Sequence, residues 1–498
     1  MLLPILLGVL FAIAYTQSPL YTSNQNQYFL HGLAQAGFGN LKQDWLANTL
    51  DPTPVFSVLI SLTYRLTQQP FLYYLYYTVL LALYLFCLVG IMDSLFNLRR
   101  SPARQAVFLA LVFLAHSAAL RFGLSRLIGE NWTYLLEDGL ADQRLLGPVF
   151  QPSAFGVLLL VSIYLFLKRK PLIAVLAAAL AATIHPTYLL SAAALTLSYM
   201  LASYLEERRL GKALLIGGVA LLAVTPILVY VYSSFGDTST ESSAKAQAIL
   251  VNFRIPFHAL ISRWFDWTAI IKIALLLAGL VVLRRTRLFL VLLVPALLAA
   301  LLTIAQALTQ NNTLALLFPW RISTFLVPLA VAALLAKGTN LLFMRFPGWE
   351  SKYARRTQAF CYTFIGMLVV VGIVRMSLDF QRQDNLPDRG VLSYVAVNHT
   401  GEQVYMVPLD MQDFRLATGA PVYVEFKSIP YQDRDVLEWA RRIQNTDQFY
   451  KKSDCGSLEK IARWGITHII GPPKLFDINC AEWQEVYRDD NYAVYALR

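Results

Sequence analysis

The chain has 498 residues, of which 57% are hydrophobic and only 15% are charged, and its mean hydropathy is +0.50. Several apolar runs reach the ~20 residues that a helix needs to cross a bilayer, which excludes a wholly soluble protein. The net charge of +11 is unevenly spread, because the first 378 residues carry 28 Lys and Arg against 13 Asp and Glu, whereas the remainder carries 14 against 18. The basic excess therefore reports membrane topology, and nucleic acid is not an expected partner.

The apolar runs predict an α-helical polytopic membrane protein with about eleven transmembrane helices. In chain order the expected crossings are Leu2–Tyr15, Phe71–Met92, Gln105–Phe122, Phe150–Leu167, Leu172–Ile184, Tyr188–Leu205, Ala213–Tyr232, Trp267–Leu283, Leu288–Leu308, Phe318–Ala336 and Gln358–Met376. The first run could instead be a signal peptide, but no Lys or Arg precedes it, which favours a retained helix. These crossings define an expected transmembrane domain over residues 1–378.

One set of alternating loops is basic throughout and so predicts the cytoplasmic side. Its members are Arg99, Arg100, Arg104, Lys168, Arg169, Lys170, Arg208, Arg209, Lys212, Arg284, Arg285, Arg287, Lys337, Arg345, Lys352, Arg355 and Arg356. The assignment puts the N-terminus in the cytoplasm and the C-terminal tail outside. It holds only if the stretch 53–66 does not cross. That stretch is short, with Val55, Leu59, Leu62 and Leu66 on one face, and predicts a helix lying in the membrane interface.

The outer loops are long, at 18–70, 123–149, 233–266 and 309–317, which indicates function rather than mere connection. The Ser- and Thr-rich stretch 234–247 predicts a mobile loop.

Residues 385–498 predict a small extracytoplasmic α/β domain. Its expected strands are Gln403–Leu409, Pro421–Phe426, Thr467–Ile470 and Tyr492–Leu497. Its expected helices are Arg434–Tyr450 and Ser457–Trp464. Outside the cell Cys455 and Cys480 could form a disulfide, or they could remain two thiols.

Two acids in the first outer loop are the leading catalytic candidates. Asp44 lies in a QDW motif, and Asp51 precedes Pro52 at the start of the interfacial helix. A carboxylate here could act as general base on an acceptor hydroxyl or hold a divalent cation. The alternative is an ordinary turn or helix-start residue, above all for Asp51. We expect Asp44 to face a cavity at the outer leaflet.

The second outer loop carries a cluster of opposite charges. Its members are Glu130, Glu137, Asp138 and Asp142, beside Arg121, Arg126 and Arg144. For most of them a solvated, self-paired cluster is the expectation. From this group we select Arg126 and Glu130 as candidate substrate-binding residues.

Two further residues suit an anionic group near the outer surface. Arg321 lies just inside the outer end of a crossing, where Arg is costly, and its planar fork matches phosphate. His185, before Pro186 at an outer turn, could contact a phosphate or a sugar hydroxyl. The alternative for Arg321 is an interfacial side chain paired with a loop acid. The alternative for His185-Pro186 is a simple helix break.

The organisation resembles the GT-C superfamily of membrane glycosyltransferases, which includes protein O-mannosyltransferases and aminoarabinose transferases. The matching features are an N-terminal helix, the acid of QDW at 43–45, DPTPVF at 51–56, PWRISTFLVP at 319–328 and a C-terminal outer domain. The segments QYFLHG at 27–32, FQPSAFG at 150–156, IHPTYLL at 184–190 and FRLATGAPVYVEFK at 414–427 are similar to an uncharacterised bacterial branch. Asp51 or Thr53 occupies the usual His position, and Ile322 replaces the usual Tyr.

The resemblance implies an enzyme of the cell envelope, in the inner membrane. It would transfer a sugar from a polyprenyl-phosphate donor to an extracytoplasmic acceptor hydroxyl, with Asp44 as base or acceptor-orienting acid and Arg321 neutralising the lipid phosphate. The expected partners are membrane lipid and this lipid-linked sugar. The alternatives are a lipid-linked glycan transporter and a non-catalytic envelope scaffold.

Overall fold

A computed structural model describes residues 2–452, 454–473, 480 and 482–498, and the chain forms two compact units. The first unit consists of Met1–Gln17, Tyr73–Tyr230 and Val251–Ser377. The second consists of Ser18–Leu72, Val231–Leu250 and Leu378–Arg498. The second unit therefore contains two earlier segments of the chain in addition to the C-terminal tail.

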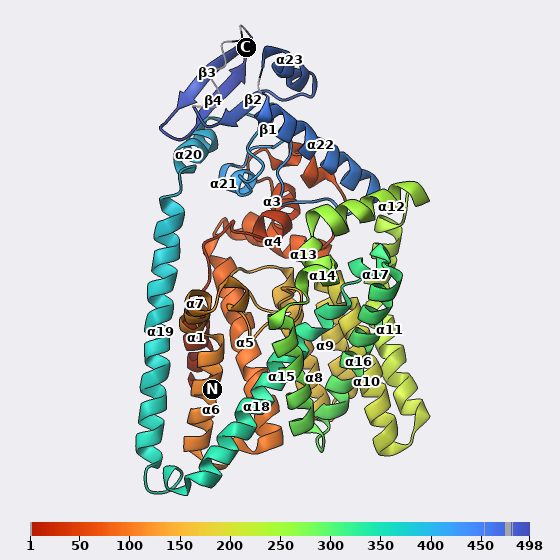
Figure 1. Ribbon diagram of the computed structural model, residues 1–498, viewed down its shortest axis with the longest axis vertical. Helices are drawn as coiled ribbons and strands as arrows, with labels where there is room; N and C mark the ends of the chain where they lie inside the picture. The colour runs from red at the N-terminus through yellow and green to blue at the C-terminus, as the bar shows by residue number, and fades with distance from the viewer. Residues whose placement is uncertain (1, 453, 474–479, 481) are drawn as a thin grey trace. The chain divides into compact units, whose positions relative to one another are not determined.

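The first unit is helical throughout its described part (Figure 1). Its helices are α1 (Leu2–Tyr15), α5 (Phe71–Phe96), α6 (Pro102–His116), α7 (Ala118–Leu127), α8 (Val157–Leu167), α9 (Pro171–Ile184), α10 (Leu189–Glu207), α11 (Leu210–Phe235), α13 (Pro256–Ala259), α14 (Ile261–Trp264), α15 (Trp267–Leu283), α16 (Leu288–Thr309), α17 (Asn312–Leu316), α18 (Ser323–Arg345) and α19 (Ala354–Asp384). The helices α5, α11 and α19 have residues in both units. Each of the eleven expected crossings coincides with one or two of these helices.

In the described part of the chain, six helical segments are long and apolar enough to span a membrane, or seven if α6 and α7, bent by 51°, form one span. The six are Phe71–Phe96, Pro186–Glu207, Leu210–Phe235, Leu288–Thr309, Asn312–Arg345 and Ala354–Asp384. Four further expected crossings are shorter apolar helices, at Leu3–Tyr15, Pro152–Leu167, Pro171–Ile184 and Trp267–Leu283. The chain is thus a helical membrane protein, and the count of eleven crossings stays a prediction.

Close packing within the first unit depends on small residues. The helices α8 and α9 pack together, as do α10 and α16, and α15 and α18 (Figure 1). At Gly279 on α15, an added Cβ would lie 2.5 Å from the Cβ of Ala330 on α18. Only a glycine allows α15 and α18 to approach so closely at this point. The contact holds α18, which follows the turn begun by Pro319, against α15.

The second unit contains a four-stranded sheet and eight helices within its described residues. The elements are α2 (Gln25–Tyr28), α3 (Leu30–Ala36), α4 (Pro54–Thr67), α12 (Thr240–Ile249), α20 (Arg389–Asn398), α21 (Phe414–Thr418), α22 (Asp433–Lys451), α23 (Cys455–Arg463), β1 (Tyr405–Met406), β2 (His468–Gly471), β3 (Trp483–Arg488) and β4 (Ala493–Leu497). The strand order is β1-β2-β4-β3, with β1 and β2 parallel and the other pairs antiparallel.

The sheet buries both faces, which follows from the two-residue period of its strands. Ile469 and Tyr495 pack with residues of α22 and α23, whereas the adjacent Ile470 and Val494 pack with residues of α20 and α21. The predicted α/β tail is therefore confirmed in outline. The third strand, β3, was not among the expected strands, because its sequence WQEVYR buries only Trp483 and lacks an apolar run.

One expected strand is wrong. Pro421–Phe426 makes only a single bridge, between Val422 and Tyr405. The carboxylate of Glu425 accepts hydrogen bonds from the backbone N–H groups of Lys427 and Ser428, so the chain turns where the strand was expected to continue. A buried acid that binds its own backbone outweighs the local β propensity.

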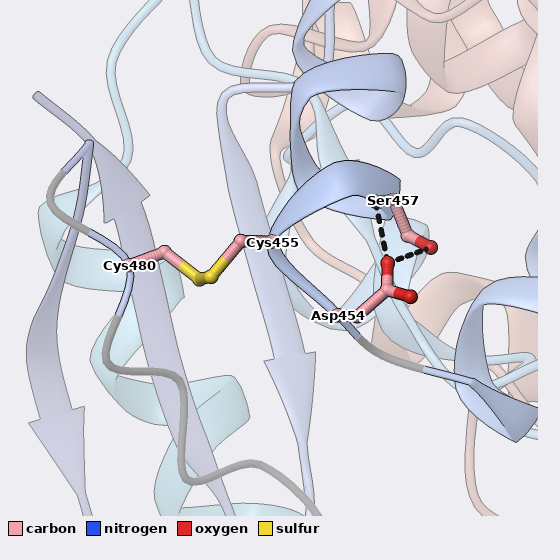
Figure 2. Close-up of a disulfide and its surroundings, with 4 residues drawn as sticks. All are labelled: Asp454, Cys455, Ser457 and Cys480. Atoms are coloured by element: carbon pink, nitrogen blue, oxygen red, sulfur yellow. Dashed lines mark hydrogen bonds between the residues drawn. A yellow bond between two sulfur atoms is a disulfide. The ribbon is translucent and has the colours of Figure 1, made fainter.

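The disulfide between Cys455 and Cys480 is present, with 5.8 Å between the two Cα atoms. Figure 2 shows that it joins the first residue of α23 to the segment before β3. The neighbouring Asp454 caps α23, because its Oδ1 accepts hydrogen bonds from the backbone N–H and the hydroxyl of Ser457 (Figure 2). The cross-link and the cap together fix the start of this helix.

Hydrogen bonds join the three segments of the second unit. The side chain of Gln27 exchanges two hydrogen bonds with the backbone of Ile429, at 3.0 and 2.6 Å. The carboxylate of Asp433 accepts from the backbone N–H and the hydroxyl of Thr238. The stretch 234–247 is accordingly not the mobile loop that its composition indicated: it contains most of α12, capped by Ser239.

Candidate functional site

Three short turns of the first unit, each begun by a proline, carry the sequence motifs of the predicted site. They are the 3-10 helices Pro152–Gly156, Pro186–Tyr188 and Pro319–Ile322. Proline is well suited to the first position of a helical turn, because its missing N–H would have no partner there. The second and third turns contact each other, and the hydroxyl of Tyr188 donates to the carbonyl of Ser153 at 2.7 Å. The three motifs thus come together in space.

The structure brings together the two residues proposed to contact a phosphate. The Nη1 of Arg321 lies 3.2 Å from the Nε2 of His185, although 136 residues separate them. Since a guanidinium is only a donor, Nε2 must accept. Burial and the charge of Arg321 both lower the pKa of His185 well below its usual range, which agrees with a neutral imidazole.

The charge of Arg321 is not neutralised within the described part of the chain. No carboxylate forms an ion pair with it, and its buried Nε has no hydrogen-bond partner there. The rings of Tyr188 and Phe318 lie under the guanidinium, with centroids at 5.7 and 5.9 Å. Arg321 is partly buried, and a cation withdrawn from water in this way normally has an anionic partner. This arrangement is chemically suited to bind an anion.

Further polar atoms on or beside the three turns are buried without a hydrogen-bond partner among the described residues. They are the Oε1 of Gln151, the Oγ1 of Thr187 and the Oγ of Ser191. Such atoms are rare in native proteins unless a ligand or water binds them. Sequence reasoning missed these three residues. The available signal for Gln151 and Thr187 was their place beside a proline in the motifs FQPS and IHPT, whereas Ser191 lies outside both motifs.

Asp44 does not have the surroundings of a general base, which corrects the leading sequence-based expectation. Its side chain is fully buried in the second unit. Oδ1 accepts from the backbone N–H groups of Leu46 and Ala47, at 2.9 and 3.2 Å. Oδ2 accepts from Arg415 Nε at 2.7 Å and from the backbone N–H of Val422 at 2.9 Å. Both oxygens are occupied, so neither can take a proton from a substrate without breaking the fold.

Arg415 makes Asp44 part of a buried ion triad. Its Nη1 donates to Glu425 at 2.9 Å, so one guanidinium binds two carboxylates, and all three side chains are almost wholly buried. The triad joins the QDW motif of the first outer loop to the motif FRLATGAPVYVEFK. These two motifs meet for a structural reason.

Asp51 also belongs to the second unit. It is half-buried, and its Oδ1 accepts from the backbone N–H of Thr53 at 2.9 Å, immediately before α4. This is the helix-start geometry that its position before proline favours.

Arg126 and Glu130 lie on the surface of the first unit. Both are exposed: Arg126 lies over the ring of Phe122, and Glu130 accepts a hydrogen bond from Ser125. Neither bonds to His185 or Arg321 in the region that the structure describes. The structure therefore does not bring these two candidates to the three turns.

The neighbouring acids Glu137 and Asp138 are buried rather than solvated, contrary to expectation. Glu137 pairs with Arg121 at 3.2 Å, and Asp138 pairs with Lys272 at 2.5 Å and more distantly with Arg144. Lys272 lies on α15, so its contribution could not be inferred from the local sequence of the loop.

Within the described ranges, no group of three or more His, Cys, Asp or Glu side chains is placed to hold a metal ion.

Residues 388–446 match the family model described as a domain of unknown function, DUF6798. The match includes Arg415 and Glu425 of the triad but not Asp44. No curated protein matches the chain at a significant level.

Proposed function

We propose that the protein transfers a sugar from a polyprenyl-phosphate donor to an extracytoplasmic acceptor hydroxyl at the membrane surface, as a GT-C-type glycosyltransferase of the inner membrane. The observation that carries the proposal is the guanidinium of Arg321, which is bound to a neutral His185 and has no acid partner in the described chain. A lipid phosphate is an anion that would satisfy it.

Transfer of a sugar from a lipid phosphate needs few catalytic groups besides a positive charge at the phosphate. When the bond between the sugar and the phosphate breaks, negative charge develops on the departing phosphate oxygen. A preorganised donor that meets this charge stabilises the transition state by about 3 kcal/mol, by analogy with an oxyanion-hole donor. His185 would hold the guanidinium in place, and the unpartnered groups of Gln151, Thr187 and Ser191 suit the hydroxyls of a sugar.

The exposed face of α4 supports a role for the second unit at the membrane surface. The helix has 14 residues, so it is about 21 Å long and too short for a crossing. Its apolar side chains Val55, Val58, Leu62 and Leu66 are 41%, 51%, 50% and 80% exposed, whereas the opposite face is buried. An exposed apolar stripe of this kind fits a helix in the interface. Asp51, at its start, stays a candidate general base on its sequence position alone.

The test uses the full chain in membranes with labelled polyprenyl-phosphate sugars. We expect transfer by the wild type and none above background by Arg321→Gln or Asp51→Asn, with both variants folded. Arg126→Gln is the matched control, because that arginine is exposed and should leave transfer unchanged.

Each outcome separates the alternatives. Normal transfer by Arg321→Gln would overturn the assignment of the phosphate site. Movement of the lipid-linked sugar across the membrane without transfer would support a transporter. Absence of both activities in the wild type would support a scaffold.

A further inference from the structure

The first unit contains a hollow whose lining includes neither His185 nor Arg321. It is an apolar groove of 480 Å³ between α15, α16 and the start of α18. Four residues of α15 form one wall, at Ile273, Leu276, Leu277 and Leu280. Small residues of α16 form the opposite floor, among them Ala296, Ala299, Ala300 and Ala307. The helical spacing places each set on one face, and the short side chains of α16 leave the space open.

A polar hollow of 160 Å³ adjoins one end of this groove. The two share Leu140 and Trp264, and the polar hollow is otherwise lined by residues that include Asp142, Arg263 and Asp266. The backbone between them is held firmly: the N–H of Leu140 donates to the hydroxyl of Ser323 at 2.7 Å, and Lys272 donates to the carbonyl of Gly139 at 3.0 Å. The joint between the apolar and polar parts is therefore a built feature of the fold.

Two indole N–H donors of the groove, one of them at this joint, have no hydrogen-bond partner within the described residues. Trp264 and Trp320 are 7% and 1% exposed, with ring centroids 5.2 Å apart, and both line the groove. Neither Nε1 has a hydrogen-bond acceptor among the residues that the structure describes. A buried Trp N–H usually finds an acceptor, so a ligand with acceptor oxygens would complete this end of the groove.

The acids and cations on and around the polar hollow balance in number, but Arg263 is a cation without a direct partner in the part of the chain that the structure describes. Asp266 caps α15 by accepting from Ala269, Lys272 pairs with Asp138, and Asp142 pairs with Arg144. The side chain of Arg263 is exposed and has no hydrogen bond or ion pair within the described chain. Arg263 lines the same hollow as Trp264, and a guanidinium with an indole donor nearby is suited to a phosphate group.

We propose that this groove and hollow form a binding site for a membrane phospholipid. One hydrocarbon chain lies between α15 and α16, and the phosphate lies beside Arg263. The volume of the groove falls within the roughly 300–1,000 Å³ of ordinary ligand sites. The lining of the groove excludes Arg321, although Trp320 of the same turn and the following Ser323 belong to it. The proposal does not depend on the proposed function.

The test uses the full-length protein in nanodiscs that contain phosphatidylglycerol with a photoactivatable diazirine on one acyl chain. We expect cross-links on α15 and on the groove face of α16, at higher yield per residue than on the exposed face of α19. Ala300→Trp fills the groove and should lower this yield roughly tenfold, the effect of losing about 50 Å² of apolar contact. Leu301→Trp is the matched control, because Leu301 is 65% exposed and does not line the groove.

Arg263→Gln tests the headgroup. It should lower cross-linking by the phosphatidylglycerol probe and leave unchanged the cross-linking by a diacylglycerol probe, which has no phosphate. Equal yields on the groove and on α19 would mean annular lipid only and would overturn the site. Equal loss of both probes in Arg263→Gln would overturn the assignment of the phosphate. Should Ala300→Trp fail to fold, Ala296→Leu fills the same floor with a smaller side chain and must show the same direction of effect.

Discussion

Two arginines in different units of the protein show how the same side chain is used in opposite ways. Arg415 binds the carboxylates of Asp44 and Glu425, and its charge is more than neutralised. Arg321 binds the imidazole of His185 and has no acid partner in the described chain. The first arrangement is complete without a ligand, whereas the second is the one at which we propose that an anion binds.

The comparison also explains why the sequence points first to the wrong acid. An aspartate in an outer loop of a membrane protein is a reasonable catalytic candidate. Burial of Asp44 with Arg415 and three backbone donors instead gives it the surroundings of a structural ion pair. A buried charge with every hydrogen bond made holds a fold together, and a buried charge with bonds missing marks a candidate site.

The largest expected effect is on the stability of the second unit. Arg415→Met leaves Asp44 and Glu425 buried without their cation, which should cost about 3–5 kcal/mol. Hydrogen exchange of the second unit at a series of denaturant concentrations would measure the loss. Arg441→Gln is the control, because Arg441 is 57% exposed and its pair with Glu438 contributes at most ~0.5 kcal/mol. Equal stability of the two variants would contradict a structural role for the triad.

Arg321→Gln should show the opposite pattern. Transfer should fall by roughly 10²- to 10³-fold, because one preorganised donor is lost. Thermal unfolding should change little, since no carboxylate loses its partner. Arg321→Lys keeps the positive charge but lacks the planar guanidinium, so it should be more active than Arg321→Gln and less active than the wild type. A large loss of stability in Arg321→Gln would place this arginine with Arg415 as a structural residue.

We expect the disulfide to stabilise part of the second unit independently of the ion triad. Replacement of Cys455 and Cys480 by Ser opens a loop with a sequence separation of 25 and should cost about 3 kcal/mol. Exchange protection should fall around α23 and β3 while the backbone N–H groups of Leu46 and Ala47 stay protected. Loss of that protection as well would show that the triad depends on the cross-link.

The smallest expected effect concerns pH. Since the pKa of His185 is lowered well below its usual range, the imidazole stays neutral between pH 6 and 8. Binding of a phosphodiester should then change less than about twofold across this range, and His185→Gln should show the same flat profile. Because the fold binds fewer protons at this residue than the unfolded chain, His185 lowers stability as pH falls below about 6.5 and has no effect above it. Tighter binding toward pH 6 in the wild type alone would contradict a neutral imidazole.

The sequence by itself determined the local features of this protein. Runs of apolar residues gave the helices at all eleven expected crossings, because the period and length of such runs are local properties. The helices α22 and α23, the strands β2 and β4 and the disulfide partners were also predictable. The motifs around Gln151, His185 and Arg321 were identified separately, since proline and an unusually placed arginine are visible in a linear chain.

Only the tertiary structure decided which charges meet. Asp44 and Arg415 are 371 residues apart, and Asp138 finds Lys272 on a helix far along the chain. No periodicity encodes such pairs, since they depend on how distant segments pack. For the same reason the sequence could not show that two outer loops complete the folded tail, or that Arg321 receives an imidazole and no acid. Burial and partners, which are properties of the packed chain, decide whether a charged residue is structural or free to bind.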